Sequence, residues 1–138
     1  MTKKVVAYQK FIRQTARKLR LVADMIRGMD VETALVQLKV SRKKGAEVLR
    51  KVLIQAKANA INTNLRSETL KISEILIEEG PSFKRWRPVS RGRAHSIMKR
   101  TSHIKLTLEG SDESVVKKAS TKKDSKTAKT DKDIKKGK

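Results

Sequence analysis

The sequence predicts an α+β fold in which three helices pack on one face of a small antiparallel sheet. Apolar residues recur at helical spacing up to about residue 62, and they alternate at strand spacing around residues 70–77 and 104–108. A long cationic segment between these last two stretches fits neither period. We expect that segment to form a protruding β-hairpin attached to a domain over residues 1–110, and residues 111–138 to form a disordered basic tail.

The chain begins with a predicted strand, Val5 to Ile12, which is followed by an amphipathic helix of about three turns. Thr15 is placed to cap the start of this helix, and Gly28 is placed to end it. The apolar residues of the helix fall at positions i, i+3, i+4 and i+7 and therefore share one face: Leu19, Val22, Ala23 and Ile26.

Two further helices are predicted before residue 62. Asp30 offers a carboxylate to the free amides of a short helix, Val31 to Lys39. Ser41 is placed to cap a longer helix from Arg42 to about Asn62, which spans roughly 30 Å at 1.5 Å per residue. The apolar residues of the longer helix step mainly by three or four: Ala46, Leu49, Val52, Leu53, Ala56 and Ala60.

The apolar period then shortens to two residues, which is typical of strands. Leu70 and Ile72 begin this pattern and Ile75 and Ile77 continue it, so the odd step between the two pairs predicts a β-bulge. The same alternation returns later in the chain, at Ile104, Leu106 and Leu108. Together with the first strand, these segments supply the predicted sheet.

The segment between Glu79 and Glu109 contains no acidic residue and eight cations: Lys84, Arg85, Arg87, Arg91, Arg93, Lys99, Arg100 and Lys105. Prolines and glycine interrupt it without helical periodicity, so we predict a hairpin over about residues 82–104 that turns near Pro88 to Ala94. Each arm would reach about 30 Å at 3.3 Å per residue. Because a two-stranded ribbon this polar is marginally stable in water, something outside the chain must hold it.

A run of charge can instead be an ordinary solvated face. Such faces usually mix both signs, whereas unopposed cations repel one another unless a polyanion lies beside them. Arginine predominates over lysine near the turn, and its planar guanidinium suits phosphate contact and base stacking. Trp86 has two interpretations: it stacks on an unpaired base, or it anchors the hairpin on the domain surface.

The composition points to the same class of partner. The 138 residues carry 35 Lys+Arg against 14 Asp+Glu, a formal net charge of +21, so the protein attracts polyanions and a nucleic acid above all. Residues 111–138 hold 10 Lys, 5 acids and few aliphatic residues, too few to offset the entropy lost on ordering. The chain has no Cys and no apolar run near the roughly 18 residues of a membrane span, so we expect a soluble, cytosolic protein.

Catalytic or metal-binding chemistry has little support in the sequence. His95 and His103 lie eight residues apart, with no Cys and no nearby carboxylate to complete a metal shell or orient a catalytic base. The scattered glycines form no phosphate-binding loop, which argues against an RNA-modifying or nucleotide-hydrolysing enzyme. A DNA-binding protein is the other alternative, but no predicted helix concentrates the basic residues as a recognition helix does. We expect no enzyme activity, no metal and no cofactor.

Five motifs occur together in the order and spacing of a known family: Ala16 to Gly28 (ARKLRLVADMIRG), Ala56 to Ala60 (AKANA), Glu79 to Arg85 (EGPSFKR), Arg91 to Ala94 (RGRA) and Lys99 to Ile104 (KRTSHI). From about Val5 to Glu109 the chain closely resembles the universal large-subunit ribosomal protein number twenty-two in its bacterial form. Trp86 stands where that family is expected to have a smaller residue, and the lysine-rich extension from Ser111 lies beyond the usual end of the family.

The resemblance implies a structural constituent of the large ribosomal subunit that binds 23S-type rRNA and supports assembly in the cytoplasm. Its globular part is then expected near the exit of the nascent-peptide tunnel. The hairpin tip is expected to line the tunnel, opposite a loop of ribosomal protein number four and in contact with the nascent peptide, where changes affect macrolide antibiotics. Carried onto this chain, that tip comprises Ser90, Arg91, Gly92, Arg93 and Ala94. The RNA-binding residues are expected to be Lys18, Arg20, Lys84, Arg85, Trp86, Arg87, Arg91, Arg93, Lys99, Arg100 and His103.

Overall fold

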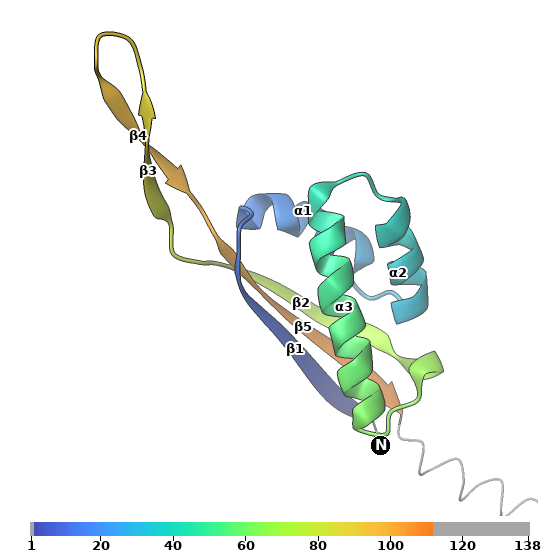
Figure 1. Cartoon of the computed structure of the whole chain (residues 1–138). Helices are drawn as coiled ribbons and strands as arrows, with labels where there is room; N and C mark the ends of the chain where they lie inside the picture. The colour runs from blue at the N-terminus through green and yellow to red at the C-terminus, as the bar shows by residue number, and fades with distance from the viewer. Residues whose placement is uncertain (1, 112–138) are drawn as a thin grey trace, which may run out of the picture.

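The computed structural model describes residues 2–111; residues 1 and 112–138, which include the predicted tail, lie outside the described part. Along the chain the elements are β1 (Thr2–Ile12), α1 (Ala16–Ile26), α2 (Val31–Val40), α3 (Lys44–Asn62), the 3-10 turn η1 (Ser67–Thr69), β2 (Lys71–Glu79), β3 (Phe83–Pro88), β4 (Ala94–Lys99) and β5 (Ser102–Ser111). Figure 1 shows the three helices on one face of the sheet formed by β1, β5 and β2, with the β3–β4 ribbon projecting from one end. The predicted α+β class with a protruding hairpin is confirmed.

β5 is the central strand of the sheet and pairs antiparallel with β1 on one side and β2 on the other. The register between β2 and β5 shifts between Ile72 and Glu74, which confirms the β-bulge predicted there. β5 extends to Ser111, which pairs with Thr2, so the sheet includes one residue past the boundary predicted at Gly110. The inward side chains of β5 are fully buried: Ile104, Leu106 and Leu108.

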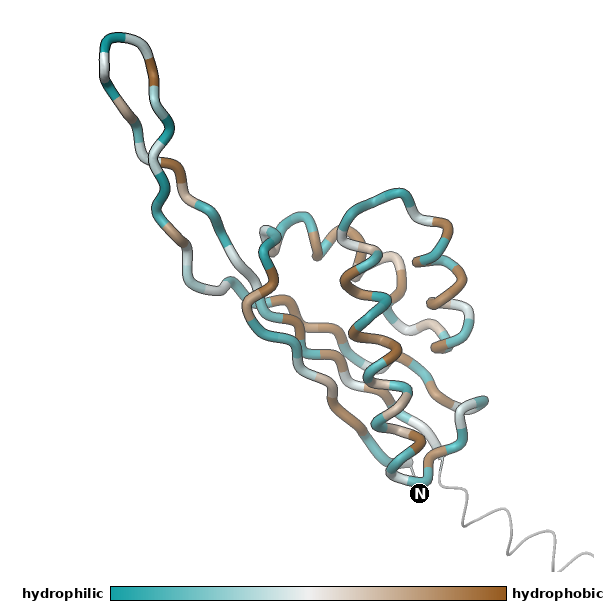
Figure 2. The backbone as a smooth tube through the Cα atoms, viewed as in Figure 1, coloured by the Kyte–Doolittle hydropathy of each residue, from teal (hydrophilic) through white to brown (hydrophobic). Residues whose placement is uncertain are grey.

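α1 and α3 bury their predicted apolar faces against this sheet, and α2 packs on α3. α3 packs on β1 and β5, while α1 packs on β2. Figure 2 shows hydrophobic residues recurring along the helices and the three sheet strands, whereas the ribbon is mostly hydrophilic. Burying one Leu or Ile side chain contributes roughly 1.5–3 kcal/mol, so the stability of the protein resides in this layer. The buried helical residues include Leu19, Val22, Ala23, Ile26, Leu49, Val52, Leu53 and Ala56.

The junction between α2 and α3 differs from the sequence prediction. Ser41 does not cap the start of α3; it follows the end of α2, and its amide donates to the Gln37 carbonyl at 3.1 Å. The hydrogen-bond ladder of α2 thus extends to residue 41, so α3 begins at Lys44, two residues later than the predicted Arg42.

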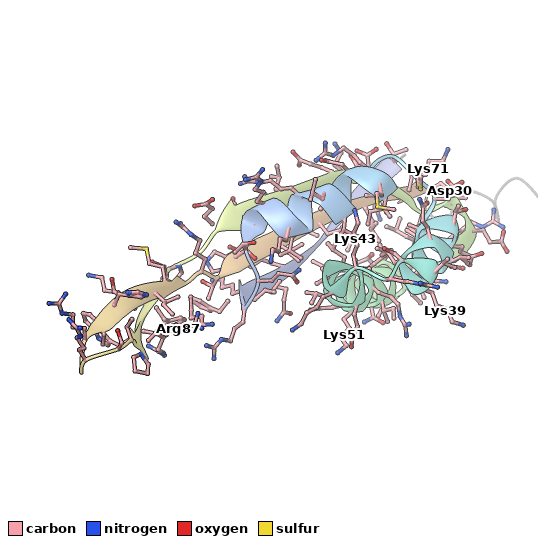
Figure 3. The ribbon with its side chains drawn as sticks, turned by 90° about the horizontal axis from the view of Figure 1, so that it is seen from above. Asp30, Lys39, Lys43, Lys51, Lys71 and Arg87 are labelled. Atoms are coloured by element: carbon pink, nitrogen blue, oxygen red, sulfur yellow. The ribbon has the colours of Figure 1, made fainter. Side chains whose placement is uncertain are left out.

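The predicted caps of the first two helices occupy the right positions but do not form capping bonds. Thr15 and Asp30 are the N-cap residues of α1 and α2, with extended backbone angles, yet neither side chain accepts an amide hydrogen of its helix. The backbone of Asp30 forms an isolated β-bridge to Lys71. The Asp30 carboxylate lies 3.8 Å from the Lys71 ammonium and does not take the capping role predicted for it. Figure 3 labels both residues, which lie at the same end of the molecule.

The outer edge of β2 is covered by the connection between α1 and α2. The amide of Gly28 donates to the Ile72 carbonyl at 3.2 Å, and the amide of Ile72 donates to the Met29 carbonyl at 3.0 Å. Gly28 has a φ of 77°, which suits glycine and ends α1 as predicted. Pairing an edge strand in this way protects it from association with other chains.

No helix within residues 2–111 is long and apolar enough to cross a membrane.

Candidate nucleic-acid interface

The ribbon is closed by a tight turn at the predicted tip. The amide of Arg93 donates to the Ser90 carbonyl at 3.4 Å, and the two residues between them, Arg91 and Gly92, have φ of 59° and 67°. Two successive positive φ angles characterise a type I′ turn, whose twist matches that of the paired strands. A non-glycine residue in this conformation costs roughly 1–2 kcal/mol. The fold therefore keeps an arginine at the tip despite backbone strain.

The cations of the ribbon lie on both of its faces. Side chains alternate between faces along a strand, so Arg85 and Arg87 share one face and Lys84 and Trp86 share the other. The register pairs Phe83 with Lys99, which places a further cation on the Arg85 face. A polyanion that neutralised all of this charge would have to contact the ribbon from two sides.

Almost every ribbon side chain is exposed. From Phe83 to Lys99 every residue is exposed except Ile97, which is half-buried. Trp86 has 70% of its surface exposed, so it does not anchor the ribbon on the domain. Of the two interpretations of Trp86, the structure is compatible with base stacking, which requires a free aromatic surface.

The cations of the ribbon also lack counter-charges within residues 2–111. The Arg85 guanidinium contacts its own strand, because one Nη donates to the Lys84 carbonyl at 2.8 Å and Cζ lies 5.6 Å from the centre of the Phe83 ring. Every salt bridge identified in the described part of the chain lies in the globular part. The ribbon cations that make neither an ion pair nor a side-chain hydrogen bond there are Lys84, Arg87, Arg91, Arg93 and Lys99.

Polar bonds at its base, rather than apolar packing, fix the ribbon on the sheet. The amide of Gly80 donates to the Thr101 carbonyl at 2.9 Å, and the Thr101 hydroxyl donates to the Pro81 carbonyl at 2.6 Å. The buried Ser102 hydroxyl donates to the Gln14 carbonyl at 2.9 Å, which ties β5 to the loop before α1. The two strands of the ribbon are therefore held together where they leave the sheet.

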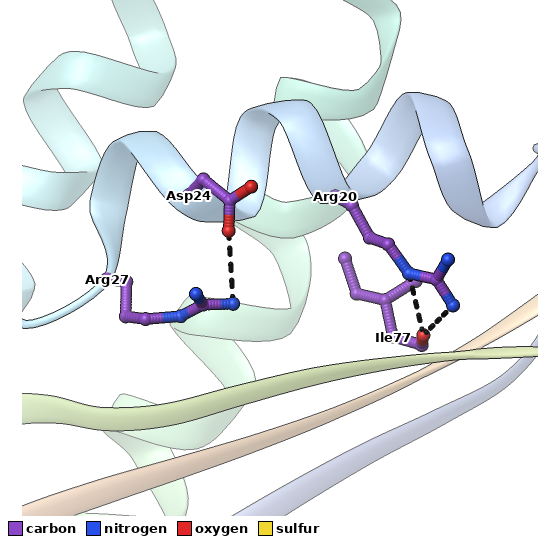
Figure 4. Close-up of polar contacts among 4 residues, drawn as sticks. All are labelled: Arg20, Asp24, Arg27 and Ile77. Atoms are coloured by element: carbon purple, nitrogen blue, oxygen red, sulfur yellow. Dashed lines mark hydrogen bonds and ion pairs between the residues drawn. The ribbon is translucent and has the colours of Figure 1, made fainter.

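The two predicted RNA-binding residues of α1 have different surroundings. The Arg20 guanidinium bridges α1 to β2, because its Nε and one Nη donate to the Ile77 carbonyl at 3.3 and 3.0 Å, as Figure 4 shows. Lys18 has no such internal bond and lies beside Lys99 and Arg100 at the foot of the ribbon. Arg20 thus positions α1 on the sheet, whereas Lys18 presents free charge.

His103 lies in the three-stranded sheet rather than in the ribbon. Its Nδ1 accepts a hydrogen bond from the Phe11 amide at 3.0 Å, and its ring meets the Phe11 ring edge-on at 5.0 Å between centres. Phe11 itself has a φ of 55°, at the point where the register between β1 and β5 shifts. The imidazole therefore supports a bend in β1, a role that the sequence motif does not reveal.

The structure also adds two cations that the sequence analysis did not include. Arg13 and Lys44 lie in one hollow with Lys18, Lys99 and Arg100. No sequence pattern indicates them, because they lie far from the hairpin along the chain and only the packing of α1 on α3 brings them there. Within residues 2–111, no group of three or more His, Asp or Glu is arranged to hold a metal ion.

Comparison with known proteins identifies the family. The family model described as "Ribosomal protein L22p/L17e" matches residues 7–109, which run from the middle of β1 to near the end of β5. The chain belongs to this family. The large ribosomal subunit protein uL22 of Syntrophus aciditrophicus is 46% identical over 104 residues, which are 75% of this chain and 94% of that protein. The uL22 protein of Clostridium novyi is 45% identical over 104 residues, again 75% of this chain and 94% of the relative.

Membership of the L22p/L17e family makes the chain a structural constituent of the large ribosomal subunit and not an enzyme. The relatives are bacterial, as the resemblance predicted. The matched region ends at Glu109, so the lysine-rich segment that follows is outside the family model. The ribbon and its foot lie wholly within the matched residues.

Proposed function

We propose that the ribbon binds large-subunit rRNA of the 23S type along both of its faces and that this contact supports subunit assembly. The observation that carries the proposal is a projecting ribbon of exposed cations with no counter-charge in the described part of the chain. The phosphate backbone of RNA supplies that counter-charge, and binding releases condensed counterions. The expected contacts are Lys18 and the predicted cations of the ribbon, with Trp86 stacking on an unpaired base.

The tip has a different task in this proposal. Ser90 to Ala94 line the nascent-peptide tunnel, facing the nascent peptide and a loop of ribosomal protein number four, while the globular part lies near the tunnel exit. In support of this assignment, the tip adds nothing to the apolar core, yet it retains a strained Arg91 beside Gly92. The protein acts as part of the ribosome in the cytoplasm.

Two double variants of equal charge change separate the arms from the tip. Arg85→Gln with Arg87→Gln should weaken binding to large-subunit rRNA and reduce the yield of assembled subunits, because these side chains lie on the arms. Arg91→Gln with Arg93→Gln should assemble subunits in normal yield but change macrolide sensitivity or stalling by particular nascent peptides. Loss of assembly in the tip variant alone would contradict the assignment, as would assembled tip-variant subunits whose drug response and stalling are unchanged.

A further inference from the structure

A hollow of about 330 Å³ lies at the foot of the ribbon, where the ribbon meets the helices. We call it the foot site. Its walls come from the loop before α1, from α1 itself, from the start of α3 and from the end of the ribbon. All charged residues that line it are cations: Arg13, Lys18, Lys44, Lys99 and Arg100.

None of the five cations of the foot site is paired with an acid in the described part of the chain. Within residues 2–111 none of them makes an ion pair or a side-chain hydrogen bond, and all five side chains are exposed. Like charges gathered around one hollow repel one another, even though solvent weakens the effect. An anion in the hollow would convert that repulsion into attraction.

The positions of these cations are set by close packing beneath them. Gly45 lies against α1 so tightly that a Cβ there would be 3.2 Å from Leu19 Cδ2. Since Lys18 and Lys44 are the neighbours of these two residues, the contact brings both lysines to the same place. The bond from the Ser102 hydroxyl to the Gln14 carbonyl then holds the Arg13 loop against the end of the ribbon. The foot site is thus built by the fold and not by one flexible segment.

The N-terminus of α1 adds to the positive potential of the foot site. Thr15, the N-cap residue of α1, lines the hollow and its side chain does not cap the first amides, so the positive end of the helix dipole lies at the hollow. A neighbouring hollow of about 340 Å³ shares Thr15 and Arg100, but it also contains Glu79. The anion is therefore expected in the foot site, where no carboxylate opposes it.

We propose that the foot site holds phosphates of large-subunit rRNA, and that Arg13 and Lys44 bind RNA together with Lys18, Lys99 and Arg100. This inference rests on the proposed function and extends it from the ribbon to the helices. Because both the ribbon and the helices form its walls, RNA bound there fixes the direction of the ribbon relative to the domain.

The test uses Arg13→Gln with Lys44→Gln in the full chain and an in vitro transcript of the large-subunit rRNA. Each phosphate contact contributes about 0.7–0.9 to the slope of log affinity against log salt, so the double variant should lower that slope by about 1.4–1.8. Its affinity at physiological salt should fall about tenfold or more. The charge-preserving exchange Arg13→Lys with Lys44→Arg should retain most of the affinity.

The matched control is Lys39→Gln with Arg50→Gln, which removes one lysine and one arginine that are exposed on the helices and do not line the foot site. If the wild-type chain itself bound rRNA without salt dependence, the proposed function would fail. If the wild type bound normally and the foot-site variant behaved like the control, the foot-site inference alone would be overturned. Normal binding to free rRNA with a reduced subunit yield would also overturn it, because the ligand would then be a protein neighbour.

Discussion

The sheet and the ribbon are both antiparallel, yet they are stabilised in different ways. In β5 every second side chain points into the core, and Ile104, Leu106 and Leu108 are fully buried. In β3 no side chain is buried, although its backbone pairs with β4 in unbroken register. Net backbone hydrogen bonding contributes little against water, whereas buried apolar surface contributes much. Strand pairing alone therefore shapes the ribbon but does not make it a stable unit.

The two regions also treat charge differently. The globular part offsets some of its cations internally, through pairs such as Lys4 with Glu109 at 2.7 Å and Lys51 with Glu47 at 3.2 Å. The ribbon and its foot present cations without such pairs in the described residues. Exposed pairs contribute little stability, so their value lies in limiting self-repulsion where no RNA is expected. The acids that form ion pairs thus lie in the globular part, whereas the cations of the ribbon and its foot are expected to be neutralised by a partner.

The largest expected effect is in the sheet. Leu106→Ala removes a fully buried side chain at the centre of β5 and should lower the free energy of unfolding by about 2–5 kcal/mol. Ile97→Ala makes a similar truncation in the ribbon, where the side chain is only half-buried, and should cost less than about 1 kcal/mol. Urea unfolding of both variants measures the difference. Equal losses would show that the ribbon is part of the cooperative core.

A smaller effect is expected where the two regions join. A Cβ on residue 80 would lie 2.5 Å from the Thr101 hydroxyl and 3.1 Å from His103 Nε2, so Gly80→Ala should destabilise the protein by about 1–3 kcal/mol. Combining it with Thr101→Ala removes the closest obstacle, and the cost of Gly80→Ala should then be smaller. A double-mutant cycle from urea unfolding checks this. Strictly additive losses would mean that Gly80 is not constrained by Thr101.

The smallest effect concerns an exposed pair at the edge of the sheet. The Lys4 ammonium, and after it the Ser73 hydroxyl 2.9 Å from the Glu109 carboxylate, lower the pKa of Glu109 below its ordinary value of 4.5. The hydrogen bond to Glu109 in turn raises the pKa of Lys4 above its ordinary value of 10.5. A lowered acid pKa gives stability that is present above pH 4.5 and lost as the pH falls below it. A raised lysine pKa gives stability that is lost as the pH rises above 10.5.

Lys4→Gln should therefore make the melting temperature slightly less dependent on pH below 4.5. Melting curves of the wild type and the variant across acidic pH measure this change. Lys105→Gln removes an exposed charge from β5 that makes no ion pair within residues 2–111, and it serves as the control. A larger loss of acid dependence in the control than in Lys4→Gln would contradict the assigned pair.

The contrast between sheet and ribbon was predictable from the sequence because it lies in periodicity and charge. Alternating Ile104, Leu106 and Leu108 predict a buried strand, and the acid-free segment with its prolines predicts a polar hairpin. Capping residues were less informative: Ser41 suits a helix start, but a backbone bond to Gln37 places it at a helix end. A local capping preference of about 1 kcal/mol is easily overridden when the preceding helix continues to that residue.

The candidate interface was only partly predictable. The cations of the ribbon are contiguous in the sequence, so their common exposure followed from composition alone. The foot site combines Arg13, Lys44 and Arg100, and no local pattern relates residues that only packing brings together. The internal bond of Arg20 to the Ile77 carbonyl was equally invisible, because an arginine that positions a helix has the same sequence signature as one that binds phosphate.

Amide hydrogen exchange tests most directly the claim that the sheet holds itself and the ribbon is held by RNA. In the free protein, the paired amides of β3 and β4 should exchange far faster than those of Ile104 to Leu108, which open only on global unfolding. Binding to large-subunit rRNA should slow the ribbon amides strongly and leave those of β5 nearly unchanged. Ribbon amides that were already as protected as β5 in the free protein, or that gained no protection on binding, would contradict the account.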